Sequence, residues 1–109
     1  MRFIALSVAA AALVLGTQAF AADAAKGKDI YVRVGCWECH GFQGQGGVGP
    51  KLAPEPLAAP ALKNFVRTTS GDMPAFTAKV LSDADLDDIY AYLQSIPKSP
   101  DVKTIPLLQ

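Results

Sequence analysis

The pentapeptide Cys36-Trp37-Glu38-Cys39-His40 says most about how this chain folds. Its pattern, C-x-x-C-H, is the signature of c-type haem attachment. The spacing suits that chemistry, because two thiols can add across the two vinyl groups on one edge of a porphyrin. The following imidazole can then approach the iron. Cys36, Cys39 and His40 are therefore predicted to hold one covalent haem.

Other uses of paired cysteines fit this chain less well. A redox C-x-x-C motif normally lies where a strand meets a helix, and no strand pattern precedes Cys36. A structural zinc site needs more thiolate and imidazole ligands than the two cysteines and one histidine supply. An iron–sulfur cluster lacks thiolates for the same reason. Haem remains the favoured cofactor.

Met73 is the candidate for a second ligand of the iron. His40 is the only histidine, and Met73 is the only methionine that remains once Met1 leaves with the N-terminal signal described below. Met73 lies in the stretch Gly71-Asp72-Met73-Pro74-Ala75-Phe76, a loop entered through glycine and stiffened by proline. A methionine can also simply fill a core. Its place in a loop between two predicted helices favours ligation.

Apolar spacing predicts a helix over about residues 24–34, with Asp23 as its N-cap. The inward stripe has i, i+3, i+4, i+7 spacing and consists of Gly27, Ile30, Tyr31 and Val34. Gly27 lowers the stability of this helix by about 1 kcal/mol relative to alanine. It indicates either a close approach of another helix or a frayed helix end.

The clearest helix of the sequence follows Ser82 and stops at Pro97. Ser82 is a good N-cap, and Asp85 completes a variant capping box. The apolar stripe comprises Leu86, Ile89, Tyr90 and Leu93, and the acidic residues 83, 85, 87 and 88 are interpreted as a solvated helix face. A shorter helix is predicted from Pro60 to the residue before Ser70. Everything else is predicted to be loop, with no strand and no repeat.

The first 22 residues have the pattern of a secretory signal peptide. A basic start at Arg2 precedes an apolar run over residues 3–15 and the small-residue stretch Ala19-Phe20-Ala21-Ala22. The run is shorter than the roughly 20 residues that span a bilayer. We expect cleavage after Ala21 or Ala22, rather than an uncleaved anchor, and a periplasmic location. The mature chain would comprise one haem domain over residues 23–97 and a C-terminal tail over residues 98–109.

Charge gives no case for binding to nucleic acid, and no stable membrane insertion is expected after cleavage of the signal. The chain has ten basic and ten acidic residues, so removal of Arg2 leaves nine against ten, a net charge of −1. No basic patch is present to bind a phosphate backbone. Partner proteins are the expected binding partners.

Together these motifs resemble a class I cytochrome c over essentially the whole mature chain except the tail. The resemblance rests on Gly27 and Tyr31, the stretch from Cys36 to His40, Gly49-Pro50-Lys51-Leu52, the Met73-Pro74 loop and Ala91-Tyr92-Leu93. It implies a small all-α fold, with about three main helices and loops wrapped around one covalent haem c. It also implies His40 as proximal ligand, Met73 as distal ligand, and the Pro50 carbonyl as partner of the second His40 ring nitrogen. Gly27 and Tyr92 would lie where the terminal helices cross.

Two departures from the family pattern accompany this resemblance. One extra residue, assigned to Gly35, lies between Gly27 and Cys36; it leaves the register of the first helix open but not the haem site. The proline-rich segment 54–60 has no assigned role. The residues Gly44 to Gly49 also spell G-x-G-x-x-G, but this dinucleotide pattern needs a preceding strand and a following helix. Here Pro50 follows instead.

Three functions remain open for such a chain, and the first is not an enzyme. It is a periplasmic one-electron carrier that meets dehydrogenases, terminal oxidases or reductases. The second is a cytochrome subunit or dedicated acceptor of a periplasmic dehydrogenase, which a near-zero net charge favours slightly, because diffusing carriers often use charge to steer encounters. The third is a five-coordinate haem enzyme or gas sensor in which Met73 does not ligate.

Overall fold

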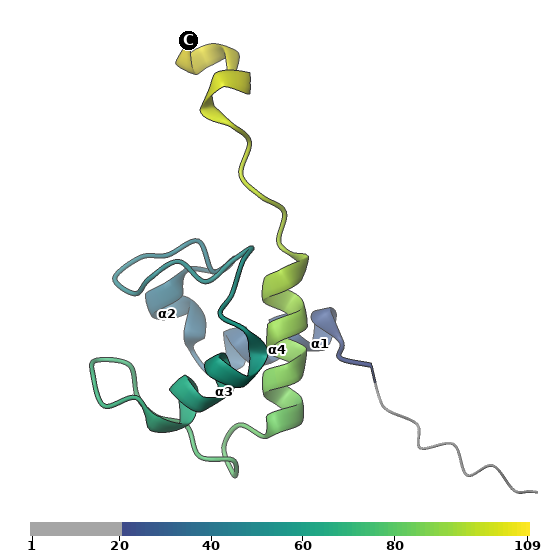
Figure 1. The fold of residues 1–109 in the computed structure, drawn as a ribbon, viewed down its shortest axis with the longest axis vertical. Coiled ribbons are helices and arrows are strands. Elements are labelled where there is room, and N and C mark those ends of the chain that lie inside the picture. The colour runs from purple at the N-terminus through teal and green to yellow at the C-terminus, as the bar shows by residue number, and fades with distance from the viewer. Residues whose placement is uncertain (1–20) are drawn as a thin grey trace, which may run out of the picture.

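The computed structural model describes residues 21–109, and this part of the chain is all-helical (Figure 1). It contains four α-helices and two short 3-10 helices, with no strand among the described residues: α1 (Ala24–Arg33), α2 (Cys36–His40), α3 (Ala59–Thr68), α4 (Asp83–Ser95), η1 (Val102–Thr104) and η2 (Pro106–Leu108). The predicted all-α fold is confirmed. The predicted signal peptide falls almost wholly on residues 1–20, outside the described part of the chain.

Helices α1 and α4 cross at Gly27, and this contact organises the domain. A β-carbon at Gly27 would lie 1.9 Å from the carbonyl oxygen of Asp88 and 2.8 Å from the backbone nitrogen of Ile89. The glycine therefore marks a close approach of two helices, not a frayed end. Next to it, the buried rings of Tyr31 and Tyr92 meet edge to face, with centroids 5.5 Å apart. The expected crossing at Gly27 and Tyr92 is confirmed.

The start of α1 is fixed by two aspartates. The Asp23 side chain accepts hydrogen bonds from the amides of Ala25 and Lys26, at 2.9 and 3.0 Å, and so caps the helix as predicted. The Asp23 amide donates to the Asp88 carboxylate at 2.8 Å, and Lys26 pairs with the same carboxylate at 2.6 Å. These contacts attach the first turn of α1 to α4.

The interpretation of the acidic residues as a solvated face of α4 is wrong at Asp88. Asp88 is only 7% exposed, because it lies at the crossing of the two helices. The Asp23 amide and then Lys26 favour its charged form, so the pKa of Asp88 lies below its usual value. The capping box at Ser82 and Asp85 is present as predicted. Sequence spacing identified a carboxylate face, but it could not show that Lys26 of α1 pairs with two of its members, Asp88 at 2.6 Å and Asp85 at 3.8 Å.

The extra residue before the haem motif forms the break between α1 and α2. Gly35 has a φ of 84°, a left-handed conformation that ends α1 and allows α2 to begin at Cys36. Gly27, Ile30 and Tyr31 are all buried as predicted, so the register of α1 is as expected. The short helix α2 was not predicted, because five residues are too few to show a helical period.

The remaining core lies between α3, α4 and the loops around them. Helix α3 begins within one residue of the predicted start and buries Leu62 and Val66. Helix α4 contributes Leu86, Ile89 and Leu93, and the loop before it contributes Leu81. Partly buried side chains complete this core, among them Val34, Leu52, Met73 and Phe76. The core therefore surrounds a space that the next subsection describes.

The C-terminal tail leaves the helical body at the end of α4 (Figure 1). Lys98 pairs with Glu55 at 2.5 Å and so joins the base of the tail to the proline-rich segment. Beyond it, η1 and η2 pack against each other and against none of the helices α1 to α4 of the described chain, so the tail has short local structure rather than the loop predicted for it. No helix within residues 21–109 is both long and apolar enough to cross a bilayer.

Candidate haem site

A cavity of about 330 Å³ lies between α2, α3, α4 and the loops that join them. Almost all of its wall is apolar. Sixteen residues line it: Tyr31, Cys36, His40, Pro50, Lys51, Leu52, Leu57, Leu62, Phe65, Val66, Met73, Phe76, Leu81, Leu86, Ile89 and Leu93. Four of the five predicted site residues, Cys36, His40, Pro50 and Met73, are among them. The structure thus brings together residues that are 37 positions apart in sequence, from 36 to 73.

His40 is buried, and its ring is oriented by the backbone of Pro50. The Nδ1 atom lies 2.8 Å from the Pro50 carbonyl oxygen, as the resemblance to class I cytochromes c implied. Because a carbonyl only accepts, Nδ1 carries the proton and Nε2 keeps its lone pair. Gly49 makes this approach possible, since a β-carbon there would lie 2.9 Å from the His40 ring. The arrangement leaves one imidazole nitrogen available as a ligand.

The two cysteines lie on one short helix with His40. Positions i, i+3 and i+4 of a helix share a face, so Cys36, Cys39 and His40 are neighbours on α2. Cys36 is half-buried and lines the cavity, whereas Cys39 is exposed, and neither forms a disulfide. Burial raises the pKa of the Cys36 thiol to about 11. A dithiol redox motif needs a lowered thiol pKa instead, so this environment disfavours that alternative.

Two buried tyrosines hold the chain directly after His40. The Tyr31 hydroxyl donates to the Gly41 carbonyl at 2.8 Å, and the Tyr92 hydroxyl donates to the Phe42 carbonyl at 2.6 Å. Burial raises the pKa of both phenols, which therefore stay protonated donors at neutral pH. Sequence analysis placed Tyr31 and Tyr92 at the helix crossing but missed this second role. For Tyr92 the sequence could not show this role, because its hydrogen bond to Phe42 joins residues 50 positions apart.

The glycine-rich loop after α2 folds back on the haem motif. The Gly46 amide donates to the His40 carbonyl at 2.8 Å, and the Gly49 amide donates to the Cys39 carbonyl at 2.9 Å. These bonds satisfy the carbonyls left free at the end of α2. The G-x-G-x-x-G pattern therefore serves the motif beside it, and no strand precedes it in the described chain.

Met73 lines the same cavity as His40 and is partly buried. Two thiols, an imidazole nitrogen with a free lone pair, a thioether sulfur and an apolar wall are the groups that a covalent haem with two axial ligands requires. The residues present therefore fit haem c. In residues 21–109, no three His, Cys, Asp or Glu side chains lie together as a cluster that could hold a metal ion.

Comparison with known proteins agrees with this geometry. The family model described as "Cytochrome C oxidase, cbb3-type, subunit III" matches residues 22–93. The chain belongs to this family of c-type cytochrome domains. Such a cytochrome is an electron-transfer protein rather than an enzyme, and its family implies covalently bound haem c. The match ends at residue 93, within α4, so the tail lies outside it.

Several curated relatives resemble this cytochrome. Cytochrome c6 of Picosynechococcus is 35% identical over 108 residues, with 83% of this chain and 87% of that one covered. The 4-cresol dehydrogenase [hydroxylating] cytochrome c subunit of Pseudomonas putida is 38% identical over 71 residues, covering 65% and 60%. The cytochrome bc1 complex cytochrome c subunit of Corynebacterium diphtheriae is 35% identical over 83 residues, covering 72% of this chain and only 29% of that subunit. No solved structure matches the chain significantly.

Two residues at or near the site make contacts whose partners the sequence did not show. Leu57 belongs to the proline-rich segment whose role was unassigned, and it forms part of the cavity wall. Trp37 stacks on Phe42, with ring centroids 4.5 Å apart and planes 11° apart, so it packs against the loop after the motif. Both residues lie in segments without helical or strand periodicity. Their contacts depend on how the loops fold over the core.

Proposed function

We propose that this cytochrome carries single electrons on one covalent haem, attached through Cys36 and Cys39 and ligated by His40 and Met73. The observation that supports it best is that His40 and Met73 line one apolar cavity next to Cys36. When bound, the haem iron supplies reversible one-electron chemistry.

The residues of the cavity have separate tasks in this proposal. Pro50 holds the proton on Nδ1 of His40 and so directs Nε2 to the iron. The thioether of Met73 favours the ferrous state and raises the reduction potential. With His40 and Met73 both binding the iron, the chain would leave no open position on it for a substrate. The apolar wall keeps water from the cofactor, which suits outer-sphere electron transfer.

The location proposed for this carrier is the periplasm, reached through the signal of residues 1–22. Two observations support a mature chain that begins at Ala22 or Asp23. Asp23 already caps α1, so cleavage there would leave the helical domain whole. The family match begins at residue 22. N-terminal sequencing of exported protein should return one of these two residues, and a chain that retains Met1 would contradict the proposal.

A visible spectrum tests the ligand set. The protein is exported together with haem-attachment machinery, and spectra are recorded oxidised and reduced, with and without carbon monoxide. We expect sharp low-spin bands that carbon monoxide leaves unchanged. Met73→Ala should open the iron to carbon monoxide and lower the reduction potential. Rapid binding of carbon monoxide by the wild type would support the haem enzyme or gas sensor instead, and a colourless protein would exclude both.

A second candidate is the cytochrome subunit of a periplasmic dehydrogenase. The similarity to the 4-cresol dehydrogenase cytochrome c subunit favours it, together with the near-zero net charge. The C-terminal tail would then be a docking segment, since it exposes Val102, Leu107 and Leu108. Deletion of residues 99–109 should slow reduction by such a dehydrogenase while leaving reduction by a small chemical reductant unchanged. Equal rates with and without the tail would contradict the docking role.

A further inference from the structure

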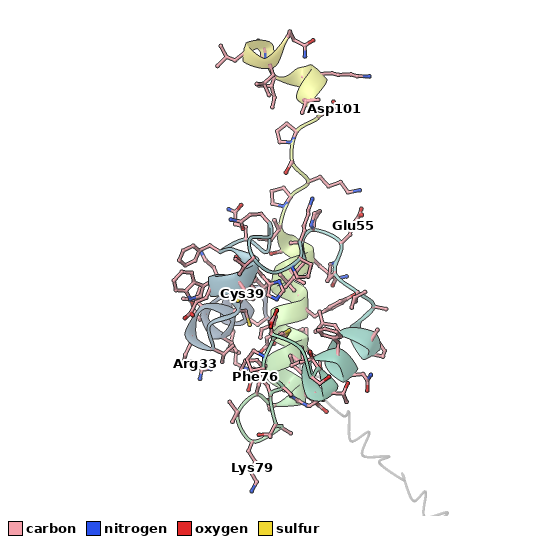
Figure 2. All side chains as sticks on the ribbon, turned by 90° about the vertical axis from the view of Figure 1, so that its left-hand side faces the viewer. Arg33, Cys39, Glu55, Phe76, Lys79 and Asp101 are labelled. Carbon is pink, nitrogen blue, oxygen red and sulfur yellow. The ribbon has the colours of Figure 1, made fainter. Side chains whose placement is uncertain are left out.

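The loop that carries Met73 is fixed to the helices at Phe76. The Phe76 amide donates to the Val66 carbonyl at 2.9 Å, and its own carbonyl accepts a hydrogen bond from Nη1 of Arg67 at 3.0 Å. Two consecutive residues near the end of α3 thus bind both polar backbone groups of Phe76. The Phe76 side chain lines the haem cavity, and Figure 2 shows it lying in front of α4.

Arg67 continues from this loop to the start of α4. Its Nη2 atom lies 2.7 Å from a carboxylate oxygen of Asp83, the first residue of that helix. One guanidinium therefore joins α3, the Met73 loop and α4. A guanidinium presents several donors in a rigid planar fork, whereas a lysine ammonium is a single nitrogen on a flexible stem. A lysine would have to reach both acceptors from one nitrogen, without the two separate donor positions of the fork.

The other side of Met73 is held far less. In the described part of the chain, the backbone groups of residues 70–75 make no hydrogen bond. Gly71 has open space around it, with nothing within 4 Å of a β-carbon placed there. Phe76 follows Met73 by three residues, which span at most about 11 Å of chain. The attachment at Phe76 is therefore the nearest restraint on where Met73 can go.

From these contacts we infer that Arg67 is a positioning residue for Met73. By holding the Phe76 carbonyl, Arg67 keeps the loop closed over the cavity and limits how often the Met73 sulfur leaves the iron. This inference rests on the proposed ligation by Met73 and adds what controls it. Asp83 acts through Arg67, because it fixes the guanidinium in the orientation that reaches the loop.

Imidazole binding to the ferric holoprotein tests the inference, because exogenous imidazole can bind the iron only when Met73 has left. Loss of a hydrogen bond from a charged donor should raise the fraction of protein in which Met73 has left the iron by about tenfold. We expect Arg67→Gln to bind imidazole about tenfold more tightly than wild type, as measured by the visible spectrum. Arg67→Lys should lie between the two. Exchange of the Phe76 amide proton should also be faster in Arg67→Gln.

Lys63→Gln is the matched control. Lys63 lies one turn earlier on α3 and pairs with Asp87 of α4 at 2.6 Å, so it also joins the two helices but does not bind the Met73 loop. Its side chain is 28% exposed, against 21% for Arg67. Lys63→Gln should leave imidazole affinity and Phe76 exchange unchanged, even if it lowers the unfolding midpoint. An equal increase in both variants would mean general loosening and would overturn the inference.

Met73→Ala separates failure of this inference from failure of the proposed function. If Met73→Ala opens the iron and Arg67→Gln binds imidazole as the wild type does, the role of Arg67 is refuted and ligation by Met73 stands. If the spectrum and imidazole affinity of Met73→Ala equal those of the wild type, Met73 is not a ligand and both proposals fail. Imidazole affinity should be lowest and equal in wild type and Lys63→Gln, higher in Arg67→Lys and highest of these four in Arg67→Gln.

Discussion

Replacement of Gly27 with alanine is expected to destabilise the domain, although alanine is the better helix former. Helix propensity alone would favour alanine by about 1 kcal/mol. The added β-carbon, however, would lie 1.9 Å from the Asp88 carbonyl oxygen and 2.3 Å from its carbon. These are backbone atoms of α4, so no side chain can turn away. The two helices would have to move apart by more than an ångström at their crossing.

The size of this effect follows from overpacking. Forced insertion of a methyl group into a packed interior costs typically about 1–3 kcal/mol, and the overlap with the backbone of α4 puts Gly27→Ala at the upper end, about 3 kcal/mol. After the gain in propensity is subtracted, we expect a net loss of about 2 kcal/mol in the free energy of unfolding. That is a large share of the roughly 5–15 kcal/mol that stabilise a domain.

Denaturant unfolding of the holoprotein, followed by far-ultraviolet circular dichroism, measures this loss. Gly71→Ala is the control, because a β-carbon at Gly71 would have nothing within 4 Å. It should be neutral or slightly stabilising, since alanine reduces the freedom of the unfolded chain. If Gly27→Ala gave little holoprotein while Gly71→Ala matched wild type, the same conclusion would follow. A Gly27→Ala protein as stable as Gly71→Ala would refute the close approach of α1 and α4.

Three further predictions concern contacts around this crossing and the tail. Asp88→Asn should lower stability by about 1–2 kcal/mol at pH 7. The pKa of Asp88 is lower in the folded state than in the unfolded state, so its charged form contributes stability above the unfolded-state pKa. This contribution is lost as the pH falls through the folded-state pKa. In unfolding measured against pH, the difference in stability between Asp88→Asn and wild type should therefore shrink below about pH 4. Tyr92→Phe should lower the free energy of unfolding by about 1–3 kcal/mol, because it leaves the Phe42 carbonyl without its donor. Tyr90→Phe removes a hydroxyl without such a contact and should be near neutral in the same assay. Deletion of residues 99–109 should leave the thermal midpoint within about 1 °C, since η1 and η2 pack on none of the helices α1 to α4 within residues 21–109. A clear drop would mean that the tail stabilises the domain.

The sequence predicted what local rules determine. The caps at Asp23 and Ser82, the stripe through Ile30 and Tyr31, and the stop before Pro97 depend on residues within a few positions of each other, and the structure has them all. The cavity residues Cys36, His40 and Met73 were also predicted, although by chemistry rather than by folding. The haem motif requires an imidazole beside the thiols, and only one methionine was left to pair with it.

What sequence reasoning missed depends on contacts between distant segments. Asp88 was taken for a surface residue because its own helix offers it no partner, and Lys26 supplies one from 62 positions away. Arg67 was not singled out by any motif or spacing in the sequence. Its value comes from Phe76 and Asp83, which approach it only once α3, the loop and α4 are packed. Neither contact has a periodic signature.

The two predicted ligands are therefore restrained in unequal ways. His40 lies in a segment whose consecutive carbonyls, from Cys39 to Phe42, all accept hydrogen bonds, and two of the donors are buried tyrosines on α1 and α4. Met73 lies in a loop whose nearest restraint is the attachment of Phe76 to α3 and Arg67. Because breaking one attachment requires less energy than breaking several cooperative ones, local opening should free the Met73 side of the cavity first. The histidine side of the site is thus its fixed part, whereas the methionine side depends on one attachment at Phe76, which the Val66 carbonyl and Arg67 form together.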